Sequence, residues 1–158
     1  MAGVSSVITA FQTLHAGITG VKTAPTAYPG KVTTADLPMV LTFPGQAITQ
    51  MRTFGANPAL SKRSSLRDYS IRLFVEPAPQ DRYDNVMQSS ITLLQRFLDE
   101  YYDNFILAAN LAHIVEVRDS GVVTGGDLVG DRGLMYAGIV YTGVIFEVNV
   151  QEWTDTTA

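Results

Sequence analysis

The chain has 158 residues, 46% of them apolar and 16% charged, with a net charge of −4, so it is long enough for one domain with a sizeable core. It contains no cysteine, which excludes disulfides, thiolate metal sites and cysteine nucleophiles. The acidic balance argues against a general nucleic-acid binder, whose footprint is strongly basic.

The N-terminal segment is predicted to form a short amphipathic helix from Val4 to Ile18. Apolar residues and one histidine recur there at spacings of three and four, and Gly20 ends the pattern. The first residues lack the basic segment of a signal peptide, and the chain has no apolar run of ~18 residues. We therefore expect a soluble protein made in a reducing cytoplasm.

Strands are expected next along the chain. A short apolar strand over 37–43 is predicted to end at Pro44-Gly45, and 48–54 is a candidate continuation as a second strand. Residues 69–76 alternate between apolar and polar side chains, which is the pattern of a half-buried strand. Its inner face is expected to carry Tyr69, Ile71, Leu73 and Val75.

Residues 51–68 form a cationic stretch in an otherwise acidic protein. The glycine, Asn-Pro and serine residues within it are typical of a mobile loop. Its cations are Arg52, Lys62, Arg63 and Arg67, with no carboxylate among residues 51–67. Such a loop indicates contact with an anionic partner, either nucleic acid or the acidic face of a neighbouring copy. The alternative is a solvated loop without a partner.

A long helix is predicted over 81–106. Its apolar stripe is expected to comprise Tyr83, Met87, Ile91, Leu94, Phe97, Leu98, Tyr101 and Phe105. Asp99, Glu100 and Asp103 crowd its C-terminal end, where the helix dipole disfavours anions. We interpret these acids as one side of a subunit contact, the alternative being a solubilising surface.

Two further strand regions complete the chain. Residues 112–119 are expected to pair with 134–153, in which Gly138 and Gly143 are bends or bulges. Between them lies a glycine-rich flexible loop at 120–133, and 154–158 is expected to be a disordered or docking tail. The predicted fold is a single α+β domain over 1–158. It has a mainly antiparallel sheet of about four to five strands, a long helix packed on one face and a short N-terminal helix.

The sequence holds no catalytic constellation. His15 and His113 are not at ligand spacing, and packed or surface roles are favoured for both. The chain has no serine nucleophile elbow and no His-Glu-x-x-His motif. The glycine-rich loop lacks the Gly-Lys-Ser/Thr ending of a phosphate loop. We therefore expect no catalytic, cofactor or metal-binding residue, and a protein that is not an enzyme.

The order of elements, together with the segments Thr33 to Pro38 and Thr42 to Gly45, resembles the tail terminator (tail completion) proteins of long-tailed, non-contractile bacteriophages. The resemblance implies a small α+β subunit that forms a hexameric ring. It implies that the ring caps the tail tube, ends its polymerisation and presents a joining surface to the head connector. The corresponding location is the tail–neck junction of the virion, after assembly in the host cytoplasm.

The implied partners are other copies of the chain, the tail-tube protein and a head–tail connector or neck protein, with no membrane. DNA passing through the channel is a further non-specific partner. The basic loop is expected to face the channel or the adjoining tube ring. The charge split suits a head-to-tail ring interface, because residues 1–80 hold 7 Lys/Arg against 3 Asp/Glu and residues 81–158 hold 4 against 12. The alternatives are another neck or tail-tube subunit, or a small α+β ligand-binding domain or enzyme.

Overall fold

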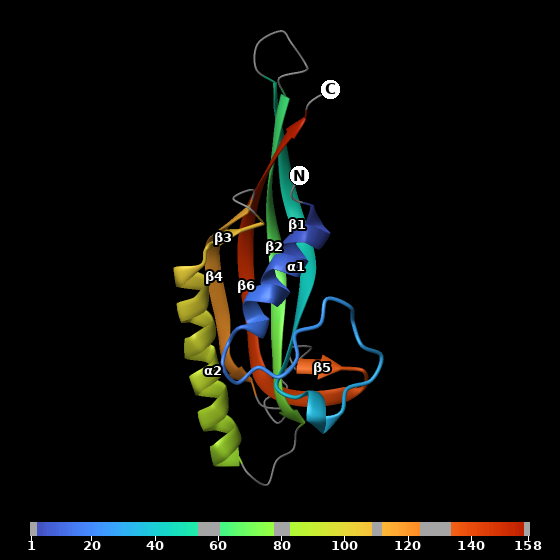
Figure 1. Ribbon diagram of the computed structural model, residues 1–158, viewed down its shortest axis with the longest axis vertical. Coiled ribbons are helices and arrows are strands. Elements are labelled where there is room, and N and C mark those ends of the chain that lie inside the picture. The colour runs from blue at the N-terminus through green and yellow to red at the C-terminus, as the bar shows by residue number, and fades with distance from the viewer. Residues whose placement is uncertain (1–2, 54–60, 78–82, 109–111, 124–133, 157–158) are drawn as a thin grey trace.

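The computed structural model (Figure 1) describes residues 3–53, 61–77, 83–108, 112–123 and 134–156. The fold is α+β, as predicted. Its elements are α1 (Val4–Ala16), a 3-10 turn (Thr34–Asp36), β1 (Met39–Thr53), β2 (Ser61–Pro77), α2 (Tyr83–Asp103), β3 (Ile106–Leu107), β4 (Ala112–Val123), β5 (Leu134–Tyr136) and β6 (Ile139–Thr156).

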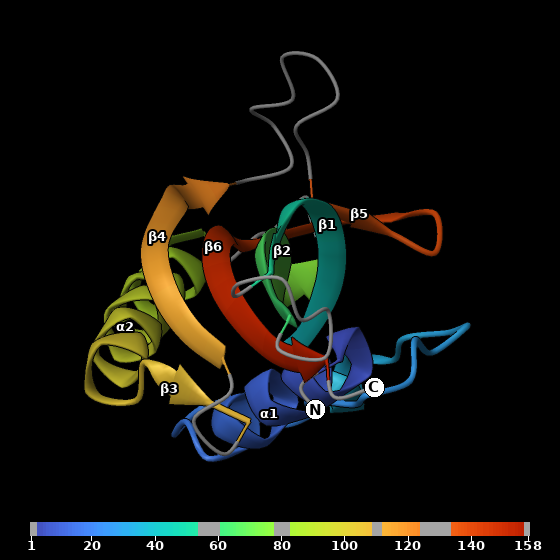
Figure 2. The ribbon, with the colours of Figure 1, turned by 90° about the horizontal axis from the view of Figure 1, so that it is seen from above.

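The strands form one six-stranded sheet in the order β1-β2-β6-β4-β3, with β5 paired to β6. Every pairing between these strands is antiparallel. Seen from above, the sheet is strongly curled, with β1 and β4 on opposite sides of the central strands (Figure 2). The antiparallel sheet is thus confirmed, and the predicted pairing of 112–119 with the C-terminal strand is confirmed as well.

Both helices pack on one face of the sheet and form the first core. The predicted inner face of β2 is confirmed, because Tyr69, Ile71, Leu73 and Val75 are all buried there. From α2, Phe97 stacks on Phe146 of β6 with ring centroids 5.2 Å apart. Phe11 of α1 lies against the ring of Tyr69. Aromatic side chains from both helices and from the sheet therefore hold these two layers together.

A second core lies on the other face of the sheet. The linker before β1 and the hairpin of β5 with β6 cover this face, so Phe74 is fully buried although its position alternates with the inner face of β2. The half-buried strand that the alternation predicted at 69–76 is therefore covered on both faces at Phe74. The second core consists of Val32, Leu37, Met39, Leu41, Phe74, Leu134 and Tyr141.

The buried stripe of α2 differs from the predicted one. Ile91 was expected in the stripe but is 46% exposed, and Phe105 follows the helix and is 48% exposed. Ser90 tolerates complete burial because its hydroxyl donates to the carbonyl of Val86, 2.8 Å away. Among the described side chains of α2, the buried ones are Val86, Ser90, Leu93, Phe97 and Tyr101, and that of Tyr83 lies outside the described residues. Apolar residues occur on more than one face of this helix, and contact with the sheet selects the stripe.

Several strand boundaries were also predicted wrongly. β1 continues through Pro44 and Gly45 as a bulge, which an outer strand permits because the missing proline N–H is not needed on its free side. At Gly45 a side chain would meet the carbonyl oxygen of Asp68 at 2.8 Å. The predicted strand over 134–153 is instead two strands, joined by a tight turn at Ala137 and Gly138 with φ of 50° and 80°.

The C-terminal predictions have mixed outcomes. The expected tail from residue 154 is instead part of β6, which pairs with β2 as far as Thr156 opposite Ser61. Gly143 lies in β6 so close to the carbonyl of Leu73 that a side chain has no room. Of the glycine-rich loop, residues 120–123 belong to β4, and 124–133 lie outside the described residues.

Candidate interaction surfaces

The described residues of the cationic stretch form paired β-strands rather than a loop, and residues 54–60 of the predicted loop lie outside the described residues. We call residues 47–53 of β1 with residues 61–67 of β2 the arm, and Figure 1 shows it extending beyond the helices together with the end of β6. Met51 pairs with Arg63 and Arg52 with Lys62. Lys62 in turn pairs with Asp155 of β6. Strand pairing on both sides of β2 holds its serines in a strand, whereas the glycine and Asn-Pro of the loop prediction lie outside the described residues. The side chains of 50–63 lie outside the described residues.

Arg67 lies at the base of the arm and binds its own chain. Its Nη1 donates to the carbonyl of Gly45 at 2.9 Å, and the side chain is half-buried. Its Nε is buried without a hydrogen-bond partner among the described residues. Arg67 therefore joins the bulge of β1 to β2, and its role as a channel-facing or tube-facing cation stays a prediction.

A buried carboxylate also stabilises the structure at the base of the arm. Glu152 of β6 is only 5% exposed and accepts a hydrogen bond from the Tyr69 hydroxyl at 2.7 Å. Burial raises the pKa of Tyr69 strongly, and the hydrogen bond and negative charge of Glu152 raise it further. The positive charge of Arg67 acts in the opposite direction on that pKa. The pair joins β2 to β6 where the arm leaves the body.

The outer edge of β1 is covered only near its start. The N–H of Val40 donates to the carbonyl of Thr23, and the hydroxyl of Tyr28 donates to the carbonyl of Thr42 at 2.6 Å. Beyond these contacts, residues 44–53 have no strand partner on their outer side within the described part of the chain. An unpaired edge of this kind is a template for another strand.

The outer edge of β4 is covered in the same partial way. β3 pairs only with Ala112 and His113, and the N–H of Ile114 donates to the carbonyl of Phe105. Among the described residues, 115–123 have no strand partner on the outer side. Val115 sits at a bulge of this edge and is 59% exposed. The sheet therefore has two open edges formed by different sequences.

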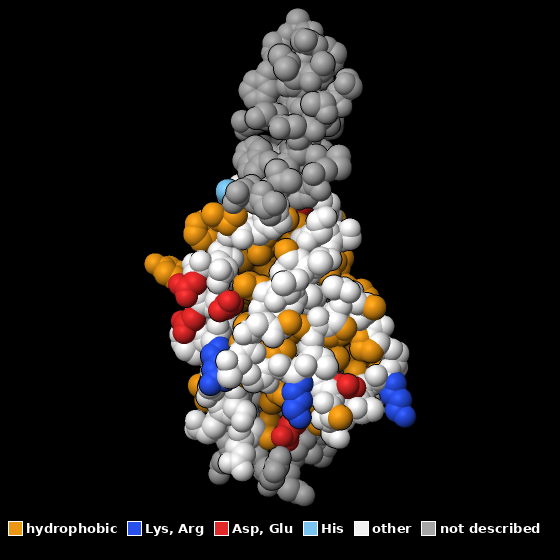
Figure 3. All heavy atoms as spheres, viewed as in Figure 1, with side chains coloured by type: hydrophobic (Ala, Val, Ile, Leu, Met, Phe, Trp, Pro, Cys, Tyr) orange, Lys and Arg blue, Asp and Glu red, His pale blue; other side chains and the backbone are white. Residues whose placement is uncertain are grey.

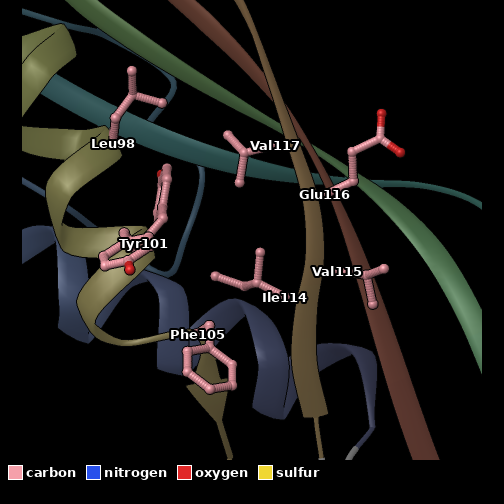
Figure 4. Close-up of a pocket in the computed structure, with 8 residues that line it drawn as sticks. Leu98, Tyr101, Phe105, Ile114, Val115, Glu116 and Val117 are labelled. Atoms are coloured by element: carbon pink, nitrogen blue, oxygen red, sulfur yellow. The ribbon is translucent and has the colours of Figure 1, made fainter.

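An apolar groove of about 510 Å³ lies between the C-terminal end of α2 and the first half of β4 (Figure 4). Tyr101 and Phe105 on one side face Ile114 and Val117 on the other, and Tyr102 at its rim is 84% exposed. Its walls are formed by Leu98, Tyr101, Tyr102, Phe105, Ile114, Val115, Glu116 and Val117. The groove, which sequence reasoning did not identify, depends on α2 ending beside β4.

The predicted acidic residues lie on the last turns of α2, beside this groove. Asp99 and Asp103 are exposed and Glu100 is half-buried. Asp99 accepts a hydrogen bond from Gln95 at 2.9 Å, and Glu100 accepts one from Asn104 at 3.2 Å. Figure 3 shows acidic side chains gathered next to apolar ones at this end of the molecule. The structure thus brings the three acids together, and their role in a subunit contact stays a prediction.

A buried polar network joins α1 to α2 and β1. The carbonyl oxygen of the Gln12 side chain accepts from the Thr42 hydroxyl and lies 2.9 Å from Nδ1 of His15. Since that oxygen only accepts, Nδ1 carries the proton and Nε2 accepts from the Tyr101 hydroxyl at 2.6 Å. Burial lowers the pKa of His15 to about 3, so the ring is neutral. His15 is therefore a packed histidine, as the sequence analysis favoured.

No protein-family model matches this sequence, and no curated protein matches it. Within the described ranges, no group of three or more His, Asp or Glu residues is placed to hold a metal ion. None of the helices in the described part of the chain is long and apolar enough to cross a membrane.

Proposed function

We propose that the chain is a structural subunit that assembles with its own copies into a closed ring, in the manner of a phage tail terminator. Such a ring would cap the tail tube, stop its polymerisation and provide the joining surface for the head connector. The observation that carries the proposal is the pair of open, non-identical sheet edges at 44–53 and 115–123. Two different complementary patches are what a head-to-tail interface requires.

Strand direction favours pairing between these two edges. Along the path β1-β2-β6-β4, each strand is antiparallel to the one before it, so β1 and β4 run in opposite directions. A second copy related by rotation about a ring axis that runs along the strands keeps the same strand directions. Its β1 would then be antiparallel to β4 of the first copy, and the alternation would continue through the interface.

The curl of the sheet supports closure rather than an open stack of strands. Curled sheets that continue through each interface close on themselves, which removes every free edge. In the proposed ring, α2 is the long helix of the tail-terminator plan and stands beside the β4 edge of each subunit. The ring itself would belong to the tail–neck junction of a virion, in contact with the tail-tube protein, the connector and passing DNA.

The experiment is native mass spectrometry of the purified chain combined with negative-stain electron microscopy. We expect discrete rings of one copy number, six by resemblance. Val115→Lys places a charge on the β4 edge and should lower the fraction of rings by about tenfold at a fixed concentration. Thr92→Lys, at an exposed position of α2 on the side opposite its buried stripe, is the matched control and should leave ring formation unchanged.

Other outcomes identify the competing functions. Long tubes from the purified chain would indicate a tail-tube subunit. A chain that stays monomeric, even with unfinished tail tubes added, would overturn the proposal. A functional assay adds the protein to polymerising tail tubes and measures their length by microscopy. We expect shorter, uniformly capped tubes with the wild type and unrestricted growth with Val115→Lys.

A further inference from the structure

We infer that neighbouring copies of the ring meet at equal height, so that Arg118 of one copy binds the exposed aromatic ring of Tyr28 in the next. The inference rests on the proposed ring and names the residues that meet at its interface. A closed ring is generated by rotation alone, without displacement along its axis. With the axis along the strands, residues that meet across the interface therefore have the same height in their own copies.

One row of paired residues crosses the sheet and ends at both outer strands. Phe43 of β1 pairs with Ser70 of β2. Ser70 pairs with Glu147 of β6, which pairs with Arg118 of β4. Residues paired directly across strands have their side chains on the same face of a sheet. Because Phe43 packs against the second core, Phe43 and Arg118 are level and both lie on the face opposite the helices.

The bulges of the two outer strands also lie at one height. In β1 the bulge comprises residues 45–46, opposite Asp68 of β2. In β4 the bulge is at Val115, next to Glu116. Glu116 is level with Asp68, because Asn149 of β6 pairs with both. A bulge bends its strand and increases the local twist, so two bulges at the same height give the meeting edges a matching shape.

Tyr28 lies on the outer side of β1 at the height of this row. Its hydroxyl donates to the carbonyl of Thr42, and its ring stacks on that of Phe43 with centroids 5.0 Å apart and an interplanar angle of 16°. The guanidinium of Arg72 lies over the Phe43 ring, 5.2 Å from its centroid. Tyr28 is nevertheless 46% exposed, so part of its ring faces solvent at the open side of β1.

Arg118 brings a cation to this ring from the neighbouring copy. Its side chain is 67% exposed and lies 3.7 Å from that of Glu116, and such an exposed ion pair stabilises a single copy very little. A guanidinium is attracted to the face of an aromatic ring, and the attraction is stronger where water is excluded. The electrostatic complementarity of cation and aromatic face therefore selects a second copy as the partner of this edge.

A second row brings apolar side chains together at the same interface. Ile48 pairs with Leu66, and Leu66 pairs with Gln151. Gln151 pairs with His113, which pairs with Ile106 of β3. The two ends of this row, Ile48 and Ile106, are 71% and 45% exposed. β3 adds one strand outside β4 at this height, and the bulge of β1 lets that strand bend around it. Contact between the two isoleucines then removes apolar area from water, which favours association.

The chain contains no cysteine, which permits a direct cross-linking test of this register. Gln46→Cys with Val115→Cys places one thiol in each bulge. Paired strands bring opposite Cα atoms to ~4.5–5.5 Å, which is within reach of a disulfide. We expect oxidation of the rings to give covalently linked oligomers on a non-reducing denaturing gel. Thr49→Cys with Val115→Cys is the matched control, because three further residues along a strand add ~10 Å, and it should give less than about a tenth of the product.

The Arg118 contact is tested by a double-mutant cycle on the dissociation constant of the ring, measured by mass photometry over a concentration series. Arg118→Ala and Tyr28→Leu should each weaken the ring by about fivefold. The combined variant should stay within about tenfold of the wild type, because both changes remove one contact. Lys22→Ala removes a cation at another exposed position and should leave the constant unchanged. Urea unfolding of each variant verifies that the monomer is intact.

The outcomes separate this inference from the proposed function. Rings that link through the control pair instead, or that form no link between the two bulges, would overturn the equal-height contact and leave the ring standing. Rings whose dissociation constant neither Arg118→Ala nor Tyr28→Leu changes would do the same. Absence of wild-type rings would overturn both.

Discussion

The centre of the molecule, between the helices and the sheet, differs from the outer edges of the sheet in how polar groups are satisfied. In the centre, His15 and Gln12 of α1 are hydrogen-bonded to Tyr101 of α2 and Thr42 of β1 inside the protein. At the edges, residues 44–53 and 115–123 leave backbone groups without a strand partner among the described residues. The first region carries the stability of the single copy, whereas the second is the contact surface of the proposed ring. Mutations should therefore separate the two properties.

The largest expected effect is on the core. Phe97→Ala removes a fully buried ring that stacks on Phe146 and should lower the free energy of unfolding by about 3–5 kcal/mol. Ile91→Ala, on the exposed side of the same helix, should cost less than about 1 kcal/mol. Urea unfolding followed by circular dichroism measures both. Equal losses for the two variants would contradict the observed stripe of α2.

The next largest effect is a pH dependence of the free energy of unfolding, which arises from His15 in the centre of the molecule. His15 is neutral when folded, with its pKa lowered from 6.5 to about 3 by burial, so the unfolded chain binds one more proton between these values. The contribution of neutral His15 to the free energy of unfolding is complete above about pH 6.5. Below that pH it should fall by up to roughly 1.4 kcal/mol per pH unit. The Tyr101 hydroxyl stays neutral throughout, because burial raises its pKa.

The measurement compares urea unfolding of the wild type and His15→Gln at several pH values from 7 to 4. The difference in stability between the two proteins should shrink as the pH falls, since only the wild type loses the histidine contribution. A constant difference would show that His15 is not held neutral. Thr92→Ala, at an exposed position of α2 without a titratable group, serves as the control and should leave the slope unchanged.

The smallest effect separates Arg67 from two other cations of the arm, Lys62 and Arg63. Arg67→Ser removes the hydrogen bond to the Gly45 carbonyl and should lower monomer stability by about 1 kcal/mol. Lys62→Ser with Arg63→Ser should leave monomer stability within about 0.5 kcal/mol and instead reduce ring formation and its dependence on salt. Thermal melts and mass photometry at two salt concentrations measure these effects. If Lys62→Ser, Arg63→Ser and Arg67→Ser together left tube capping, ring formation and genome ejection unchanged, the arm would have no functional role.

Part of this architecture followed from short-range patterns. The alternation at 69–76 predicted the buried face of β2, because successive side chains of a strand point to opposite faces. Apolar residues at spacings of three and four in the N-terminal segment predicted α1, because side chains at these spacings lie on one face of a helix. Pattern reasoning failed where a second layer covers a surface, as at Phe74, and where strand partners stabilise a polar segment, as in the arm.

The sequence by itself determined the α+β class, the inner face of β2, the charge separation and the grouping of Asp99, Glu100 and Asp103, since each depends on composition or on neighbours within a few residues. The tertiary structure decided which stripe of α2 is buried, that residues 51–53 and 61–67 are paired strands, and that a groove opens beside β4. These features depend on contacts between residues far apart in the chain. Local propensity is too weak to specify such contacts without the packing partner.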